Sequence, residues 1–146
     1  RELLARAAGG AALGEDAGLA AFAAQQVCFV PQAPHAWLFP QCSCVVHHGG
    51  TGAAHAALRA GLPAVVTPVF ADQFANARAV HALGVGFGFG QALPNISEEQ
   101  LEYALKVVET CGPKVRALAG QLQAEKGVKY AGIIIDGFLR REVTSG

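Results

Sequence analysis

A histidine pair followed at once by a glycine-rich turn is the part of this chain best suited to chemistry. The segment is His47-His48-Gly49-Gly50-Thr51-Gly52-Ala53, and an Ala-rich stretch with helical spacing comes directly after it. Backbone N–H groups at a helix entrance can point at an anion, which the helix dipole also favours. An imidazole can donate a further hydrogen bond to a phosphate oxygen. We therefore expect this turn to bind phosphate.

A carboxylate and an amide follow the next apolar run along the chain. Asp72 and Gln73 follow the run at residues 64–69 after two intervening residues, Phe70 and Ala71. Open α/β sheets hold their ligands at the carboxyl ends of the strands. An ionised Asp accepts hydrogen bonds from sugar hydroxyls, and Gln both donates and accepts. A phosphate site and a hydroxyl-binding pair one strand apart predict a phosphorylated sugar or a nucleotide as the ligand.

The elements that must position these residues alternate between short apolar runs and helical patterns. Such alternation predicts an α/β fold, a Rossmann-like parallel sheet with flanking helices and right-handed crossovers. Strands are expected at residues 27–30, 44–47, 64–69 and 85–89. Helices are expected at residues 2–8, 16–25, 35–39, 51–60, 73–83, 98–110, 113–126 and 130–141.

Several helix ends carry local signals. Ser97 followed by Gln100 is a capping box, and Asp72 is expected to cap the helix that follows it. Gly61 and Gly84 come directly after helical patterns, where glycine commonly ends a helix. We expect a poorly defined Ala/Gly-rich helical lead-in at residues 1–26 and one Rossmann-like domain at residues 27–146 that binds the phosphorylated sugar or nucleotide.

Composition limits the function. The chain has 146 residues, of which 52% are apolar and 15% charged, and this balance predicts a well-filled core. Eleven basic residues match eleven acidic ones without a basic cluster, so nucleic acid is not an expected partner. No apolar run is long enough for a membrane span. The chain opens at Arg1 without Met or signal peptide, and we expect it to be a piece of something longer.

The cysteines indicate a reducing compartment. Cys28, Cys42, Cys44 and Cys111 match no usual zinc spacing, and cysteine is often a small buried residue of the core. We expect buried free thiols, no metal site and a cytoplasmic protein.

Four linked blocks of sequence resemble a known family. They are residues 34–40, 45–52, 58–63 and 68–73. Together they resemble the carboxy-terminal, donor-binding half of a GT-B glycosyltransferase. The resemblance is greatest to sterol 3-beta-glucosyltransferases and to the related macrolide and glycopeptide enzymes of the UDP-glycosyltransferase family.

The resemblance implies a role for each matching residue. His48 would touch the diphosphate of a UDP-sugar, and the amides of Gly49, Gly50, Thr51, Gly52 and Ala53 would hold the same phosphates. Asp72 and Gln73 would bind hydroxyls of the transferred hexose, glucose being the expected one. Val30, Gln32, His35 and Trp37 would lie near the uracil ring and ribose. The UDP-sugar is a substrate, and neither cofactor nor metal is implied.

The sequence also departs from the family pattern. Ala53 stands where a Thr or Ser hydroxyl commonly reaches phosphate, and His55 and Ala56 replace small residues and a ribose-binding Glu. In the family, the acceptor site and the catalytic base lie in an amino-terminal half. We expect that half to lie outside this chain and to make any peripheral membrane contact. A hexosyltransferase acting on a lipophilic acceptor such as a sterol is therefore expected only with that half. The alternatives are a degenerate binding or structural module and one chain of a split enzyme.

Some candidates have simpler structural interpretations. His47 should point away from His48 and is interpreted as structural, and we assign no site role to His55 or His81. Trp37 could stack on a base, but we favour core packing. Asp72 could serve only as a helix cap, so Gln73 discriminates better between the two interpretations.

Overall fold

The structure is a computed structural model that describes residues 15–28 and 30–143 and contains two compact units, Arg1–Pro34 and His35–Gly146. The described part of the first unit contains α2 (Glu15–Gln26), which agrees with the helix expected at residues 16–25. The helix expected at residues 2–8 lies outside the described residues. The domain boundary expected after residue 26 stays a prediction.

The buried strand expected at residues 27–30 is wrong for the three of its residues that are described. Val27, Cys28 and Val30 are exposed and belong to no strand. The N–H of Val27 instead donates to the carbonyl of Ala23, which continues the end of α2. A strand is stable only when its backbone groups pair with a neighbouring strand, and these residues have none.

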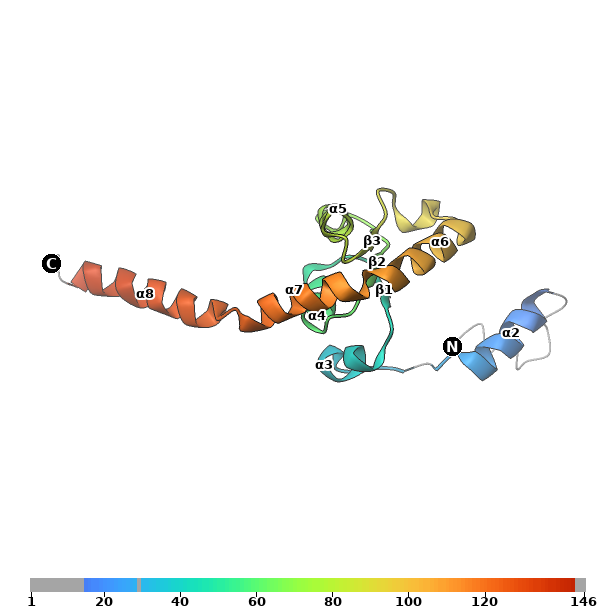
Figure 1. Cartoon of the computed structure of the whole chain (residues 1–146), viewed down its shortest axis with the longest axis horizontal. Coiled ribbons are helices and arrows are strands. Elements are labelled where there is room, and N and C mark those ends of the chain that lie inside the picture. Colours follow the sequence, from blue (N-terminus) through green and yellow to red (C-terminus); the bar gives the residue numbers. More distant parts are fainter. Residues whose placement is uncertain (1–14, 29, 144–146) are drawn as a thin grey trace. The chain divides into compact units, whose positions relative to one another are not determined.

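The second unit is organised around a three-stranded parallel sheet (Figure 1). Its strands are β1 (Val45–His47), β2 (Ala64–Val66) and β3 (Gly86–Gly88), in that spatial order. Val65 in the middle of β2 lies opposite Val46 on one side and Phe87 on the other. The crossovers contain α4 (Thr51–Arg59) and α5 (Gln73–Leu83). The expected α/β class and parallel sheet are confirmed, with shorter strands than predicted.

Helices pack on both faces of this sheet (Figure 1). Ala64 and Val66 of β2 contact one group of buried residues on α5 and α7 (Gly112–Ala124). Val65 points to the opposite face and packs against α6 (Glu98–Val108). This alternation follows from the twofold side-chain period of a strand, and it explains why β2 is apolar throughout.

The remaining elements are short, apart from the last helix. They are α3 (His35–Leu38), η1 (Phe39–Gln41), η2 (Leu93–Asn95), η3 (Glu109–Cys111) and α8 (Gly127–Val143). The capping box is confirmed, because Ser97 Oγ accepts from the N–H of Gln100 while Gln100 Oε1 accepts from the N–H of Ser97. None of the described helices is long and apolar enough to cross a membrane.

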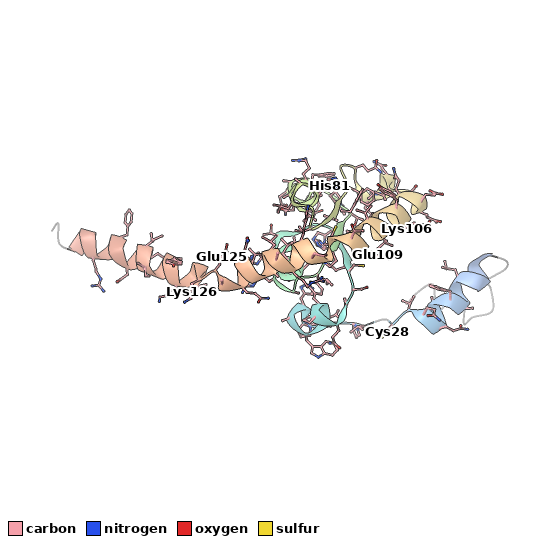
Figure 2. The ribbon with its side chains drawn as sticks, viewed as in Figure 1. Cys28, His81, Lys106, Glu109, Glu125 and Lys126 are labelled. Atoms are coloured by element: carbon pink, nitrogen blue, oxygen red, sulfur yellow. The ribbon has the colours of Figure 1, made fainter. Side chains whose placement is uncertain are left out.

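Two side chains on the outer helices illustrate an ion pair within a helix and a packing contact with the sheet. Lys106 of α6, labelled in Figure 2, donates to Glu102 one helical turn earlier. His81 of α5, also labelled there, packs edge-on against Phe87 at a ring distance of 5.1 Å. No role in the candidate site was expected for His81, and its place against the β3 ring agrees with a packing role.

The expectation that the cysteines are buried is correct only for Cys111. All four are free thiols, but Cys28 is exposed, and Cys42 and Cys44 are partly buried. Cys42 Sγ donates to the carbonyl of Leu38 at the end of α3. The difference arises because the segment at residues 42–44 precedes β1 and is not part of the strand, so it is not covered on both sides.

Candidate functional site

The glycine bend begins directly after β1 and is held by side chains on both sides. Gly49 has φ +91°, and a Cβ there would lie 2.7 Å from Val66 Cγ1. Its N–H donates to His47 Nδ1 at 2.9 Å, and its carbonyl accepts from Asn76 Nδ2 at 2.8 Å. The bend therefore needs glycine at this position, for backbone conformation and for space.

His47 is a neutral, structural residue of this bend. Because Nδ1 accepts the Gly49 N–H, the ring proton lies on Nε2, which is buried without a hydrogen-bond partner among the described residues. Burial, together with a smaller contribution from the nearby His48 and His35, lowers the pKa of His47 to about 4. The backbone of His47 is also used, since its carbonyl accepts from the N–H of Thr67. The structural role expected for His47 agrees with these contacts.

The amides beyond Gly49 lie at the entrance of α4. Gly50 is the N-cap and has no side-chain capping bond, and its carbonyl accepts from the N–H of Ala54 at 3.0 Å. The N–H groups of Thr51, Gly52 and Ala53 therefore precede the first helical hydrogen bond and have no acceptor within the helix. They point along the helix dipole, whose positive end favours an anion.

His48 is exposed beside this entrance. A Cβ placed on Gly50 would lie 2.5 Å from His48 Nε2, so the imidazole covers the Gly50 backbone. The ring thus lies next to the amides that sequence analysis assigned to phosphate. The Gly49 amide differs from the others in that set, because its N–H already donates to His47. The candidate phosphate donors are therefore His48 and the amides from Gly50 to Ala53.

The loop after β2 is shaped by Gln73. Gln73 is buried, and its Oε1 accepts from the N–H groups of Val69 at 2.8 Å and Phe70 at 3.1 Å. Ala71, which follows Phe70 in this loop, has φ +56°, an unusual conformation for a residue with a side chain. Oε1 already accepts two hydrogen bonds from the loop, so Nε2 is the group of Gln73 that is left to contact a ligand, as a donor.

Asp72 does not cap α5 as predicted. It precedes the helix, but its own backbone is helical (φ −65°, ψ −14°) and its side chain makes no capping hydrogen bond. A capping side chain needs an extended backbone to turn toward the helix N–H groups, and Asp72 lacks it. Its exposed carboxylate instead accepts from Thr51 Oγ1 at 3.4 Å, a long hydrogen bond.

The two parts of the candidate site meet through Asn76. Its Nδ2 donates to the carbonyl of Gly49 and lies 3.4 Å from Thr51 Oγ1, which in turn reaches Asp72. The glycine bend after β1 and the Asp-Gln pair after β2 therefore lie side by side at the carboxyl ends of neighbouring strands. A diphosphate on the bend would leave its attached group next to Asp72.

The residues predicted near the base are divided between the two units. Val30 and Gln32 lie in the first unit and His35 and Trp37 in the second, and all four are exposed. His35 stacks on Phe39 with ring centres 4.5 Å apart. The core packing favoured for Trp37 is wrong: the residue is 63% exposed, because α3 is only four residues long and buries none of them.

Two cavities of the second unit lie elsewhere. One of about 570 Å³ lies between Phe87, Phe89 and Tyr103 near the end of β3. The other, of about 450 Å³, lies at the opposite ends of the strands and includes Cys44 and Arg116. Neither is lined by a residue predicted for the site. The described residues contain no group of three or more His, Cys, Asp or Glu placed to hold a metal ion.

Two residues of this region, Asn76 and Ala71, were not among those predicted from the sequence. Asn76 follows Asp72 by four positions, so both lie on one face of the first helical turn, and this spacing was the available signal. Ala71 offers no signal, because alanine is not a residue that usually indicates a positive φ. The Gln73 side chain binds the two residues before Ala71, a contact that only the folded loop reveals.

Comparison with known proteins gives one consistent picture. Residues 15–130 match the family model of the erythromycin biosynthesis protein CIII-like C-terminal domain. The chain is 43% identical over 101 residues to a sterol 3-beta-glucosyltransferase of Saccharomyces cerevisiae, which covers 67% of this chain and 8% of that protein. It is 36% identical over 122 residues to the Komagataella phaffii enzyme of the same name, covering 82% of this chain and 10% of the relative.

A plant relative and a solved structure extend the comparison. A sterol 3-beta-glucosyltransferase of Arabidopsis thaliana is 37% identical over 120 residues, which is 80% of this chain and 18% of the relative. The crystal structure of the glycotransferase of kitacinnamycin superposes with a TM-score of 0.64 at 27% identity, covering 72% of this chain and 28% of that one. The chain therefore spans less than a fifth of the length of these curated relatives.

Proposed function

The chain belongs to the family of erythromycin biosynthesis protein CIII-like C-terminal domains, and on this premise we propose that it is the donor-binding half of a UDP-sugar-dependent glycosyltransferase. The proposed whole protein transfers a hexose, glucose in the first instance, to a hydroxyl of a lipophilic acceptor such as a sterol. Relatives named sterol 3-beta-glucosyltransferases support this choice of sugar and acceptor.

One observation carries the proposal. Thr51 at the entrance of α4 contacts Asp72 at the end of the β2 loop, and Asn76 contacts the bend and Thr51 together. One hydrogen-bond network therefore connects the bend, whose following amides suit a diphosphate, with a carboxylate that suits sugar hydroxyls. A nucleotide-sugar carries a diphosphate and sugar hydroxyls next to each other and could use both parts of this region. A simple phosphate would use only the amides.

The proposed chemistry follows from the charge that develops as the bond breaks. The acceptor hydroxyl attacks the anomeric carbon of the sugar, the bond from that carbon to the phosphate oxygen breaks, and UDP leaves with the bonding electrons. The α4 amides and His48 would stabilise the charge on the departing diphosphate without a metal ion. Asp72 and Gln73 Nε2 would orient the hexose for this attack.

The acceptor site and the base that removes the hydroxyl proton are proposed to lie in another part of the whole protein. A lipophilic acceptor would reach that part from a membrane surface, so a peripheral membrane contact there is part of the same proposal. The curated relatives, of which this chain spans less than a fifth, are long enough to contain such a part.

Calorimetry with UDP and UDP-glucose tests the donor role. We expect the folded chain to bind both ligands and to bind UDP-glucose more tightly, because Asp72 and Gln73 add contacts to the sugar. Adding an amino-terminal acceptor half from a relative and assaying glucosylation of a sterol then tests the whole reaction. A folded chain that binds neither ligand would refute the proposed function.

Two departures favour a second candidate, a donor domain kept as a binding or structural module. Ala53 offers no hydroxyl to a phosphate, and the Gly49 amide is already used by His47. Failure of the same calorimetric experiment, with the fold intact, would favour this module. A split enzyme would instead bind UDP-glucose and transfer the sugar once the separate acceptor chain is supplied.

A further inference from the structure

We propose that His47 and Asn76 are positioning residues that clamp the backbone of Gly49 and so hold the following amides in place for a diphosphate. The role in binding rests on the proposed function, whereas the clamp itself is a property of the chain without ligand. The clamp consists of the Gly49 N–H donating to His47 Nδ1 (2.9 Å) and the Gly49 carbonyl accepting from Asn76 Nδ2 (2.8 Å).

The clamp uses both backbone polar groups of Gly49, the N–H of the peptide before it and the carbonyl of the peptide after it. A buried glycine with φ +91° has little intrinsic preference for one conformation, because glycine samples positive and negative φ about equally. Two short hydrogen bonds from opposite sides select one of these conformations. The direction of the Gly50, Thr51 and Gly52 amides then follows, since they continue the same turn into α4.

Each half of the clamp is anchored in a different element. His47 is the last residue of β1, and its carbonyl accepts from the N–H of Thr67 after β2. Asn76 lies in the first turn of α5, where its N–H donates to the carbonyl of Asp72 at 3.0 Å. The bend is thus fixed relative to the strand that precedes it and to the helix that follows Asp72.

Asn76 also links the bend to the proposed sugar contact. Its Nδ2 reaches Thr51 Oγ1, and Thr51 donates to Asp72 Oδ2. Loss of Asn76 would free the bend and remove one of the groups that orient Thr51 beside the Asp72 carboxylate. Asparagine suits this position because it donates two N–H groups, whereas Asp at the same position would place a carboxylate against the Gly49 carbonyl.

Amide exchange in the chain without ligand tests the clamp directly. We expect the Gly49 N–H to exchange at least tenfold more slowly than that of Gly52, an exposed residue in the first turn of α4. His47→Leu should abolish this protection, whereas His47→Asn should retain much of it because the amide oxygen lies close to the position of Nδ1. Equal exchange of Gly49 and Gly52 in the unaltered protein would overturn the clamp without any variant.

UDP binding tests the positioning role. Asn76→Ala should weaken UDP binding about tenfold, whereas Asn95→Ala, an exposed asparagine of η2 with no described side-chain hydrogen bond, should leave it unchanged. Both variants should show the far-UV spectrum of the unaltered chain. UDP affinities of the two variants within twofold of each other would overturn the positioning role.

The two experiments separate the clamp from the function on which its role rests. If the unaltered chain binds no UDP, the proposed function and the binding role both fail, while slow exchange of Gly49 still supports the clamp. If UDP binds normally but Gly49 exchanges rapidly, the donor function stands and the clamp is wrong.

Discussion

The two sides of the candidate site differ in how firmly the chain holds them. On the phosphate side, Gly49 has both backbone polar groups bound at 2.8–2.9 Å and no room for a side chain. On the sugar side, Asp72 is exposed and makes one long contact, at 3.4 Å, to Thr51. Gln73 is buried, but its oxygen stabilises its own loop.

This difference indicates how binding energy would be used at the site. A preformed bend needs little ordering when a diphosphate arrives, so most of the contact energy appears as affinity. An exposed carboxylate can adjust to a hexose, but its ordering opposes binding. We therefore expect the phosphate side to control affinity and the sugar side to control the choice between UDP and UDP-sugars.

The largest expected effect comes from filling the space at Gly49. Gly49→Ala places a Cβ 2.7 Å from Val66 Cγ1 in a conformation that alanine disfavours. Backbone strain and overpacking together should lower the free energy of unfolding by about 2–4 kcal/mol. Urea unfolding measures this change.

Gly52 is the matched control for that substitution. Nothing lies within 4 Å of a Cβ at Gly52, which is in the first turn of α4, so Gly52→Ala should stabilise the chain by roughly 0.5–1 kcal/mol. Equal urea midpoints for Gly49→Ala and Gly52→Ala would mean that the bend is not held as described.

His48 should control the affinity for UDP. Removing a hydrogen bond to a charged group costs about 1.5–3 kcal/mol, so His48→Ala should weaken UDP binding roughly tenfold to a hundredfold. Unfolding should change little, because His48 is exposed. His55→Ala, an exposed histidine of α4, is the control, and calorimetry that finds equal UDP affinities for the two variants would remove His48 from the site.

Gln73→Glu separates the loop contacts of Gln73 from its proposed sugar contact. Glutamate keeps the oxygens that accept from Val69 and Phe70 but loses the Nε2 donor. Losing one donor to a neutral hydroxyl costs about 0.5–1.5 kcal/mol, so the preference for UDP-glucose over UDP should fall roughly twofold to tenfold.

For each variant, the quantity to compare is the ratio of the affinity for UDP-glucose to the affinity for UDP. The charge added by glutamate affects the binding of both ligands, so it changes this ratio less than it changes either affinity. Gln121→Glu on the exposed side of α7 adds the same charge away from the site and should leave the ratio unchanged. A Gln73→Glu ratio equal to that of the unaltered chain would show that Gln73 does not contact the sugar.

The sequence predicts the elements of the fold better than the pairing between them. The runs at residues 27–30 and 45–47 are both short and apolar, yet only the second is a strand. Val45–His47 pairs with β2, which follows after one crossover helix, whereas Val27 and Val30 have no neighbouring strand. Local pattern describes what a segment can form, and a partner decides whether it does.

In the candidate site, the parts formed by the backbone could be predicted from the sequence. Gly49 and the α4 entrance follow from residue type and order, because glycine permits the bend and a helix start presents free amides. The side-chain contacts were not predictable in this way. Asp72 has the sequence signature of a cap, but its helical backbone directs the carboxylate to Thr51, and Trp37 remains exposed on a helix too short to pack.

The dependence of stability on pH through His47 is one of the smaller expected effects. Burial, with the charges of His48 and His35, lowers its pKa from 6.5 to about 4 in the folded chain. Between pH 4 and 6.5 the unfolded chain therefore binds more protons at this residue, and stability should fall as the pH is lowered through this range. Partial exposure of the ring lets solvent screen the charge, so we expect a loss of about 1 kcal/mol.

Urea unfolding at several pH values checks this expectation, with His47→Asn as the comparison. Asparagine offers an acceptor to the Gly49 N–H but does not titrate, so this variant should lose the part of the slope that belongs to His47 while keeping the bend. An identical slope in the variant would assign the pH dependence to other groups. It would also mean that protonation of His47 does not compete with the Gly49 hydrogen bond, so the phosphate side would be held less firmly than its distances indicate.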